Sequence, residues 1–218
     1  MSVTTTDTKR LPPLKWVGAF VNERARDIQE GYRWDRSDAV AALARLRRGA
    51  GKPIAEVPDL WGLVLDERFY RDAPRLSEKA MENAEDAAHI ALTLYAVHQQ
   101  SRHDDRMHRR GHGLGEAVRR LMPGADIDEP LRKRFVQAGS ALSSAALAYR
   151  LREIIVLLRR DAIPLDYGLL ADQIHDFQRP DGAKRVRAAW GRGFHSYRPS
   201  ADEDPTGTDD PTTDKDVS

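Results

Sequence analysis

Apolar residues recur every three to four positions along most of this chain, which is the spacing of one face of an α-helix. Runs of β-branched residues are scarce, whereas Ala, Leu and Arg, which favour helices, are abundant. Both patterns predict an all-α helical bundle of about eight to nine helices. We expect these helices over residues 14–31, 37–49, 58–69, 77–100, 114–122, 129–138, 140–160, 164–177 and 181–194.

Several of these ranges begin or end at residues that commonly start or stop helices. Ser37 is an expected N-cap, Pro58 suits a first helical turn, and Gly49 suits a C-terminus. Asp166 and Tyr167 follow Pro164 closely, and capping of a helix start is the simplest account of that pair.

One helical domain over residues 14–198 is predicted between two terminal segments. We expect residues 1–13 to be a flexible N-terminus. Residues 199–218, rich in Asp, Thr and Pro, lack the apolar groups to fold and are expected to form a disordered acidic tail. A break near residues 101–112 or 122–128 would divide the domain into two helical halves, and the first position gives halves of 14–100 and 113–198.

Composition narrows the chemistry. The chain has no cysteine, and therefore no disulfide, thiolate ligand or cysteine nucleophile. Neither a signal peptide nor a run long enough to cross a membrane is visible, so we expect a cytoplasmic protein with no membrane partner. The phosphate-loop, Gly-x-Ser-x-Gly and His-Glu-x-x-His patterns are all missing from the sequence. We therefore predict no enzymatic activity and no cofactor.

Charge is distributed unevenly. The formal net charge is +1, but the segment 199–218 carries seven acids against Lys215 alone, so the rest of the chain carries about +7. Most of the basic residues are Arg, whose planar fork suits phosphate and carboxylate. A strongly basic body with an excess of Arg favours nucleic-acid binding.

Helical periodicity places many of these arginines opposite the apolar stripe of their helix. We also expect the pairs at 47/48, 109/110, 119/120 and 159/160 to lack matching acidic partners nearby, whereas a face built only for solubility would mix both signs. A solvated face is the alternative for any single stripe. We predict contacts to the phosphate backbone from Arg45, Arg48, Lys52, Arg109, Arg110, Arg119, Arg120, Arg132, Arg134, Arg152, Arg159, Lys184, Arg185 and Arg187.

The stretch HQQSRHDDRMHRRGHGLG, residues 98–115, allows another hypothesis. A metal-dependent helical enzyme would use its histidines and the acids Asp104 and Asp105. Only one histidine pair has helical spacing, however, and the surrounding arginines would repel a dication. A phosphate-contacting loop and a solvated polar loop are the other interpretations. The histidines concerned are His98, His103, His108 and His112.

Five segments, in this order and spacing, resemble the small-subunit (CasB-like) family of Cascade, the RNA-guided CRISPR surveillance complex of type I-E systems. They lie within residues 38–195 and read ALARLRRGAG, GHGLGEAVRRLM, RKRFVQAGSA, LAYRLREIIVLLRRDAIPLDYGLLADQIHDFQ and KRVRAAWGRGF.

The resemblance implies an all-helical, non-catalytic subunit that is present as a head-to-tail pair and binds other Cascade subunits, guide RNA and target DNA. It would hold the opened DNA, chiefly the displaced strand, and so stabilise the R-loop in antiviral defence. The family's double arginine is Arg-Glu at residues 152 and 153 here, which is a departure. Basic residues match family positions at Arg48, Arg134, Arg152, Lys184, Arg185 and Arg187.

Overall fold

The computed structural model describes residues 11, 13–122, 124 and 126–197. The expected acidic tail, 199–218, lies outside the described residues, as does all but residues 11 and 13 of the expected flexible N-terminus.

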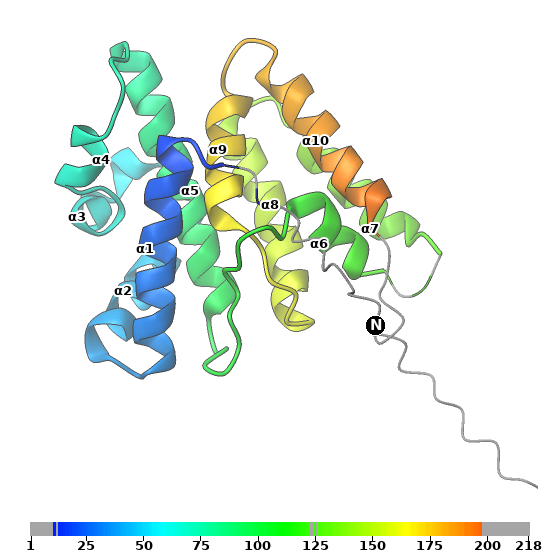
Figure 1. Cartoon of the computed structure of the whole chain (residues 1–218), viewed down its shortest axis with the longest axis horizontal. Coiled ribbons are helices and arrows are strands. Elements are labelled where there is room, and N and C mark those ends of the chain that lie inside the picture. Colours follow the sequence, from blue (N-terminus) through cyan, green and yellow to red (C-terminus); the bar gives the residue numbers. More distant parts are fainter. Residues whose placement is uncertain (1–10, 12, 123, 125, 198–218) are drawn as a thin grey trace, which may run out of the picture.

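Helices make up the described part of the chain, with a single isolated β-bridge between His108 and Leu165, so the predicted all-α fold is confirmed (Figure 1). None of these helices has the length and apolar character needed to cross a bilayer. The α-helices are α1 Trp16–Arg33, α2 Ser37–Gly49, α3 Trp61–Val64, α4 Glu67–Arg71, α5 Glu78–Gln99, α6 Leu114–Arg120, α7 Glu129–Gly139, α8 Ser144–Arg160, α9 Tyr167–Phe177 and α10 Gly182–Ser196. Two short 3₁₀ turns, η1 Ile54–Glu56 and η2 Pro58–Leu60, precede α3.

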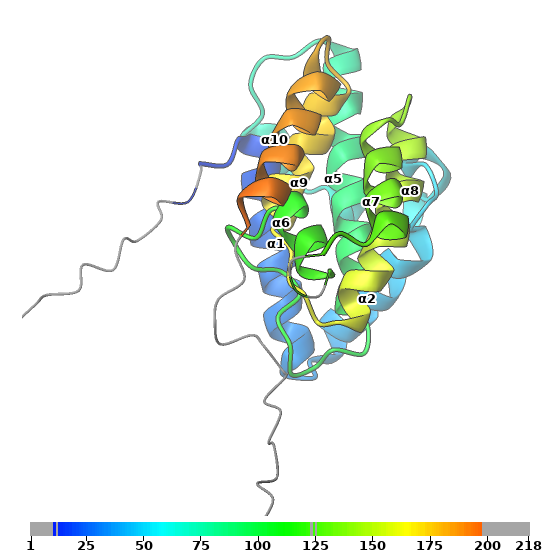
Figure 2. The same cartoon turned by 90° about the vertical axis from the view of Figure 1, so that its right-hand side faces the viewer.

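Helix α5 lies at the centre of the bundle and packs against α1, α2, α8 and α9 (Figures 1 and 2). Every residue of α5 from Ala87 to Gln99 is buried. Small side chains such as Ala88 and Ala91 allow the neighbouring helices to approach closely. A helix that is apolar all round must be covered all round, so α5 fixes the positions of its neighbours.

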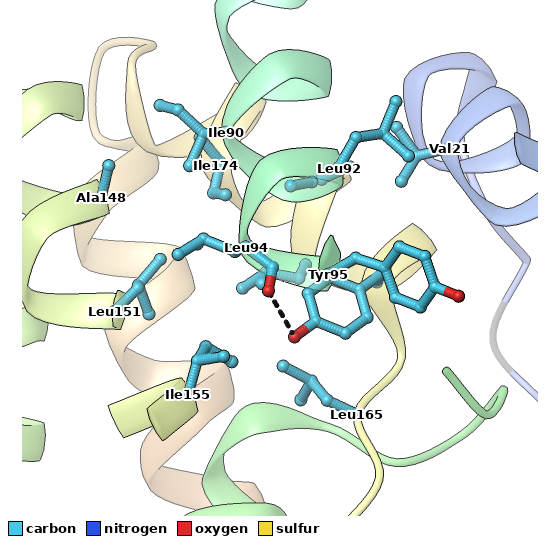
Figure 3. Packing of buried hydrophobic residues seen from close by; sticks show 14 of the residues in the cluster. Val21, Ile90, Leu92, Leu94, Tyr95, Ala148, Leu151, Ile155, Leu165 and Ile174 are labelled. Atoms are coloured by element: carbon cyan, nitrogen blue, oxygen red, sulfur yellow. Dashed lines mark hydrogen bonds between the residues drawn. The ribbon is translucent and has the colours of Figure 1, made fainter. Parts of the chain in front are cut away.

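The predicted halves share one hydrophobic core. Val21 on α1 and Leu92 on α5 belong to the same cluster of buried side chains as Leu151 on α8 and Ile174 on α9 (Figure 3). Each half therefore covers apolar surface of the other.

The helix expected over residues 58–69 is interrupted. Leu65 adopts an extended conformation after α3, with φ −126° and ψ 135°, and its side chain is buried. The Asp66 carboxylate then accepts a hydrogen bond of 2.9 Å from the Arg68 amide and caps a new helix, α4. Capping by Asp66 competes with continued helix, which the apolar spacing alone does not reveal.

The N-cap expected at Ser37 is wrong, whereas the capping role expected near Asp166 is confirmed. Ser37 is the first residue of α2, and Arg36 occupies the N-cap position. The helix expected from Pro164 begins instead at Tyr167. Asp166 is its N-cap, as predicted, and accepts a 3.0 Å hydrogen bond from the Leu169 amide.

One buried polar residue of α5, His98, has a specific partner on α9. His98 is completely buried and shares a 3.0 Å hydrogen bond with the Tyr167 hydroxyl, which in turn lies 3.4 Å from the Leu94 carbonyl. Burial is the main cause that lowers the pKa of His98, to about 3, so the imidazole is neutral in the folded protein.

We expect acid to destabilise the fold partly through His98. The unfolded chain takes up a proton near the ordinary pKa of about 6.5, while the folded chain resists it down to about 3. The free energy of unfolding therefore does not depend on His98 above about pH 6.5. Below that pH it falls by up to about 1.4 kcal/mol per pH unit because the unfolded chain binds the proton. Urea denaturation at pH 7 and pH 4.5 should show a smaller loss in His98→Gln than in the wild type. Equal losses would contradict this assignment.

Gly115 is required by the contact between α6 and α10. A Cβ atom at this position would lie 2.0 Å from the Trp190 carbonyl oxygen and 2.7 Å from the Phe194 nitrogen. Gly115→Ala should therefore lower the free energy of unfolding by about 1–3 kcal/mol or more, measured by urea denaturation. Gly191→Ala is the matched control, because a Cβ there meets nothing within 4 Å, and that variant should be neutral or stabilised by up to about 1 kcal/mol.

Candidate nucleic-acid interface

Three predicted site residues surround the turn that follows α2. Arg48 lies exposed in the last turn of the helix, and Lys52 is exposed four residues later. Arg152 on α8 reaches across and donates from Nη1 to the Ala50 carbonyl at 3.2 Å. We call Arg48, Lys52 and Arg152 the Lys52 patch. In the part of the chain that the structure describes, none of the three forms an ion pair with a carboxylate.

Residues 49–53 form a turn that we call the basic turn. A hydrogen bond from α5 fixes its backbone. His89 is buried, and its Nε2 donates to the Lys52 carbonyl at 2.9 Å. Burial lowers the pKa of His89, so the imidazole stays neutral. Gly51 has φ +86°, a conformation that favours glycine, and the Lys52 amide bonds back to the Gly49 carbonyl at 3.0 Å. The cations of the patch therefore project from an ordered backbone.

A second group of predicted site residues lies where α7 and α10 meet. Arg134 is exposed on α7, and Lys184 and Arg185 are exposed in the first turns of α10. Arg187 is also exposed and donates from Nη1 to the Gly139 carbonyl at 3.1 Å, which links the two helices. These four residues form the α7–α10 group, and no carboxylate pairs with them among the described residues.

Other predicted arginines are committed to the fold. Arg119 donates to the Met122 and Gly124 carbonyls beyond the end of α6. Arg159 donates to the Val97 carbonyl and the Gln100 side chain at the end of α5. Arg45 donates to the Asp59 carbonyl, and Arg120 is half-buried. Such bonds satisfy carbonyl groups at or near helix ends, which is a structural role.

The expectation that the arginine pairs lack acidic partners is wrong at Arg110 and Arg160, and Arg132, predicted singly as a phosphate contact, also has an acidic partner. Arg110 pairs with Asp166, with 2.5 Å between Nη1 and Oδ2. Arg160 pairs with Asp161 at 2.7 Å, and Arg132 pairs with Glu129 at 2.7 Å. Asp161 directly follows Arg160 in the sequence, and Glu129 lies three residues before Arg132. Asp166 is brought to Arg110 only by the fold.

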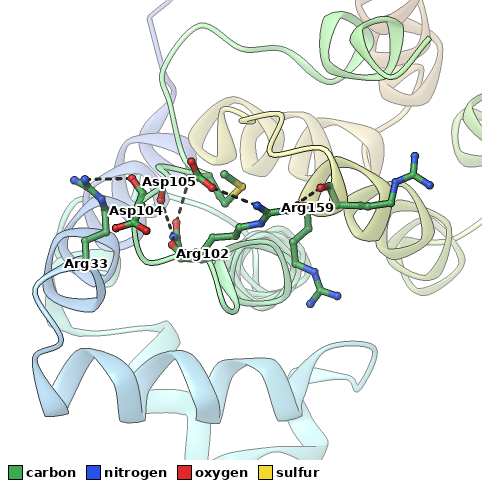
Figure 4. Close-up of polar contacts among 8 residues, drawn as sticks. Arg33, Arg102, Asp104, Asp105 and Arg159 are labelled. Atoms are coloured by element: carbon green, nitrogen blue, oxygen red, sulfur yellow. Dashed lines mark hydrogen bonds and ion pairs between the residues drawn. The ribbon is translucent and has the colours of Figure 1, made fainter. Parts of the chain in front are cut away.

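Hydrogen bonds attach the histidine-rich stretch to the helices around it. Arg102 donates from Nη2 to the Arg159 carbonyl at 2.6 Å, and Arg33 donates to the Asp104 carbonyl (Figure 4). Arg109 remains exposed, and its backbone pairs with Leu165 at 3.2 Å. Of the two adjacent arginines, therefore, Arg109 faces solvent and Arg110 binds Asp166.

The four histidines of this stretch make separate contacts and do not converge on one site. His98 bonds to Tyr167, whereas His103 stacks on Tyr32 with ring centroids 4.3 Å apart. His108 accepts from the Tyr167 amide through Nδ1 at 3.2 Å, and its Nε2 lies 3.1 Å from the Asn22 side-chain oxygen. His112 lies beside Glu116. Over the described residues no three His, Cys, Asp or Glu side chains gather closely enough to hold a metal ion, so the metal-enzyme hypothesis finds no site there.

The fold and these contacts define an all-α protein that presents exposed arginines and lysines, with Arg152 and Arg187 bonded to main-chain carbonyls of neighbouring segments. The chain belongs to the CRISPR-associated protein Cse2 family, whose model matches residues 42–195. The sequence resemblance to the CasB-like small subunits is thereby confirmed.

Solved structures agree with this assignment. The chain is 71% identical to CasB from Thermobifida fusca, with a TM-score of 0.80, and the match covers 84% of this chain and all of that one. A Cse2-family CRISPR-associated protein of Thermus thermophilus has the same fold at 22% identity and TM-score 0.62, covering 83% of this chain and 98% of that one. A chain of a CRISPR RNA-guided surveillance complex also has this fold, at 18% identity and TM-score 0.58. That match covers 80% of this chain and 93% of the other chain. No curated protein matches the chain.

The pairing of Arg110 with Asp166 generates a testable prediction. The Asp166 side chain is fully buried and also accepts from the Gly111 amide at 2.9 Å. Asp166→Ala should lower the free energy of unfolding by about 3–5 kcal/mol, because it leaves a partly buried guanidinium unpaired and removes the cap of α9. Asp166→Asn keeps an acceptor for the cap and should cost less. Urea denaturation measures both, and wild-type stability in Asp166→Ala would contradict a structural role for this pair.

Proposed function

We propose that this chain is a non-catalytic, nucleic-acid-binding subunit of a type I-E CRISPR RNA-guided surveillance complex of the Cascade type, working in the cytoplasm. It contacts the phosphate backbone of the target DNA that guide RNA has opened, chiefly the displaced strand. In this way it stabilises the R-loop during antiviral defence. Its partners are guide RNA, target DNA, the other Cascade subunits and a second copy of itself in a head-to-tail pair.

The Lys52 patch is the observation that carries this proposal. Arg48, Lys52 and Arg152 are exposed, come from two helices and a turn, and have no carboxylate partner among the described residues. Unpaired cations held on a firm backbone suit sugar-phosphate contacts, which position a strand without reading its sequence. Membership of the Cse2 family, and the likeness in fold to a chain of an RNA-guided surveillance complex, support the same role.

The energetics of strand opening explain why such contacts matter. Replacing a DNA duplex by an RNA–DNA heteroduplex is nearly balanced in free energy, so modest stabilisation of the released strand shifts the equilibrium. The α7–α10 group offers a second set of cations for the same purpose. The paired residues Arg110 and Arg132, and the carbonyl-bound Arg119 and Arg159, contribute to the fold and take no part in this proposal as strand contacts.

Neutralising together three exposed cations that have no carboxylate partner among the described residues tests the proposal. In the triple variant Arg48→Ala, Arg152→Ala, Arg185→Ala, the slope of log affinity for single-stranded DNA against log salt should become shallower by about 2, at roughly 0.7 per phosphate contact. Within the assembled complex, protection of the displaced strand from nuclease should fall. Unchanged protection together with an unchanged salt slope would refute the proposal.

A matched triple variant controls for net charge. Arg36, Arg71 and Arg160 each pair with an aspartate close in sequence and are exposed. Changing these three to Ala removes the same charge, yet it should leave the salt slope and strand protection close to wild type. Both variants should still co-purify with guide RNA and the other subunits, which shows that assembly is intact.

A further inference from the structure

Helix α8 presents an aromatic side chain to solvent on the face that carries Arg152. Tyr149 is 61% exposed and lies three residues before Arg152, so the two side chains leave neighbouring positions of one helix surface.

The basic turn borders the same surface. Lys52 and the N-terminal part of α8, including Ala145, line a small cavity of about 160 Å³. Ala145 lies four residues before Tyr149, which places these two side chains one above the other on the helix. Arg152 meets the opposite end of the turn through its 3.2 Å bond to Ala50. Tyr149 therefore lies next to the surface between α8 and the basic turn, and Lys52 and Arg152 lie on the two sides of that surface.

One face of the Tyr149 ring already carries a cation. The guanidinium carbon of Arg150 lies 5.5 Å from the ring centroid, and Arg150 is held by a 3.4 Å ion pair with Glu153. A guanidinium on one side leaves the other side of an exposed ring for a planar partner. Beside it, the unpaired cations Lys52 and Arg152 outnumber Asp86, the acid that lines the cavity, and this excess of positive charge favours a polyanion as that partner over an apolar protein surface.

We propose that Tyr149 is a stacking platform for a base of a single-stranded nucleic acid whose phosphates lie against Lys52 and Arg152. This inference rests on the proposed function and adds to it a base contact. Proteins that bind single strands without sequence preference combine a positively charged path for the backbone with aromatic rings for the bases. Stacking of this kind tolerates any base, so it agrees with a subunit that must accept every target sequence.

The test measures binding of the full chain to a labelled single-stranded DNA and to the same strand with abasic sites. Tyr149→Ala should weaken binding to the base-bearing strand by about 5- to 100-fold, and Tyr149→Phe, which keeps the ring, should bind as the wild type does. Binding to the abasic strand should be equal in all three proteins. Trp34→Ala removes another aromatic residue, 82% exposed and next to Asp35, and should change nothing.

The salt dependence separates this inference from the proposed function. Tyr149→Ala should leave the slope against salt unchanged, whereas the triple arginine variant makes it shallower. Wild-type affinity of Tyr149→Ala for the base-bearing strand would overturn the stacking role and leave the phosphate contacts standing. An equal loss on both strands would also overturn it, and so would a loss confined to binding of other subunits, which would assign this face to a protein. Failure of the triple variant to alter the slope would instead count against the proposed function.

Discussion

The burial of α5 on every side from Ala87 to Gln99 is the constraint on which the rest of this molecule depends. A helix without a solvent face must be enclosed, and α1, α2, α8 and α9 enclose it. Each of these helices turns apolar side chains inward and has an opposite face for charged groups. The position of the basic residues is thus a consequence of core packing: Arg48 lies on the exposed side of α2, and Arg152 lies on an exposed side of α8 that meets the basic turn.

Polar groups within this core connect it to the surface. His89 fixes the carbonyl of Lys52, and Gln99 donates to the Asp105 carbonyl at 2.9 Å, so two loops that carry charge are attached to the same central helix. An unpaired polar atom in the core would be costly, and each bond therefore selects one loop conformation over others. The basic turn and the histidine-rich stretch have defined positions for this reason.

Sequence periodicity was sufficient for most helices, since the signals are local: Ser77 caps α5 through the Ala80 amide, as a serine before an apolar run suggests. Contacts between distant residues were not accessible in the same way. Arg110 and Asp166 are 56 residues apart, and Arg152 and Ala50 are 102 apart, so no helical spacing relates them. Charge counting along the chain consequently grouped Arg110 with Arg109, although one is tied to a carboxylate and the other is exposed. The apolar spacing does not predict the break after α3 for a different reason. Leu65 is apolar and fits a helical stripe, although its backbone is extended.

The way in which the free arginines are held bears on how they would bind. Arginine has five N–H donors, and Arg152 and Arg187 each donate from Nη1 to one carbonyl, of Ala50 and Gly139 respectively. That single bond orders a long side chain and leaves most of its donors for a phosphate. Part of the entropy lost on ordering an arginine is then spent during folding instead of binding. A lysine of the same reach could not divide its donors between a carbonyl and a phosphate with the same fixed geometry, since its ammonium is a single point of charge. Main-chain anchoring at these two positions therefore gives a physical reason for the preference of this chain for arginine on its exposed helices.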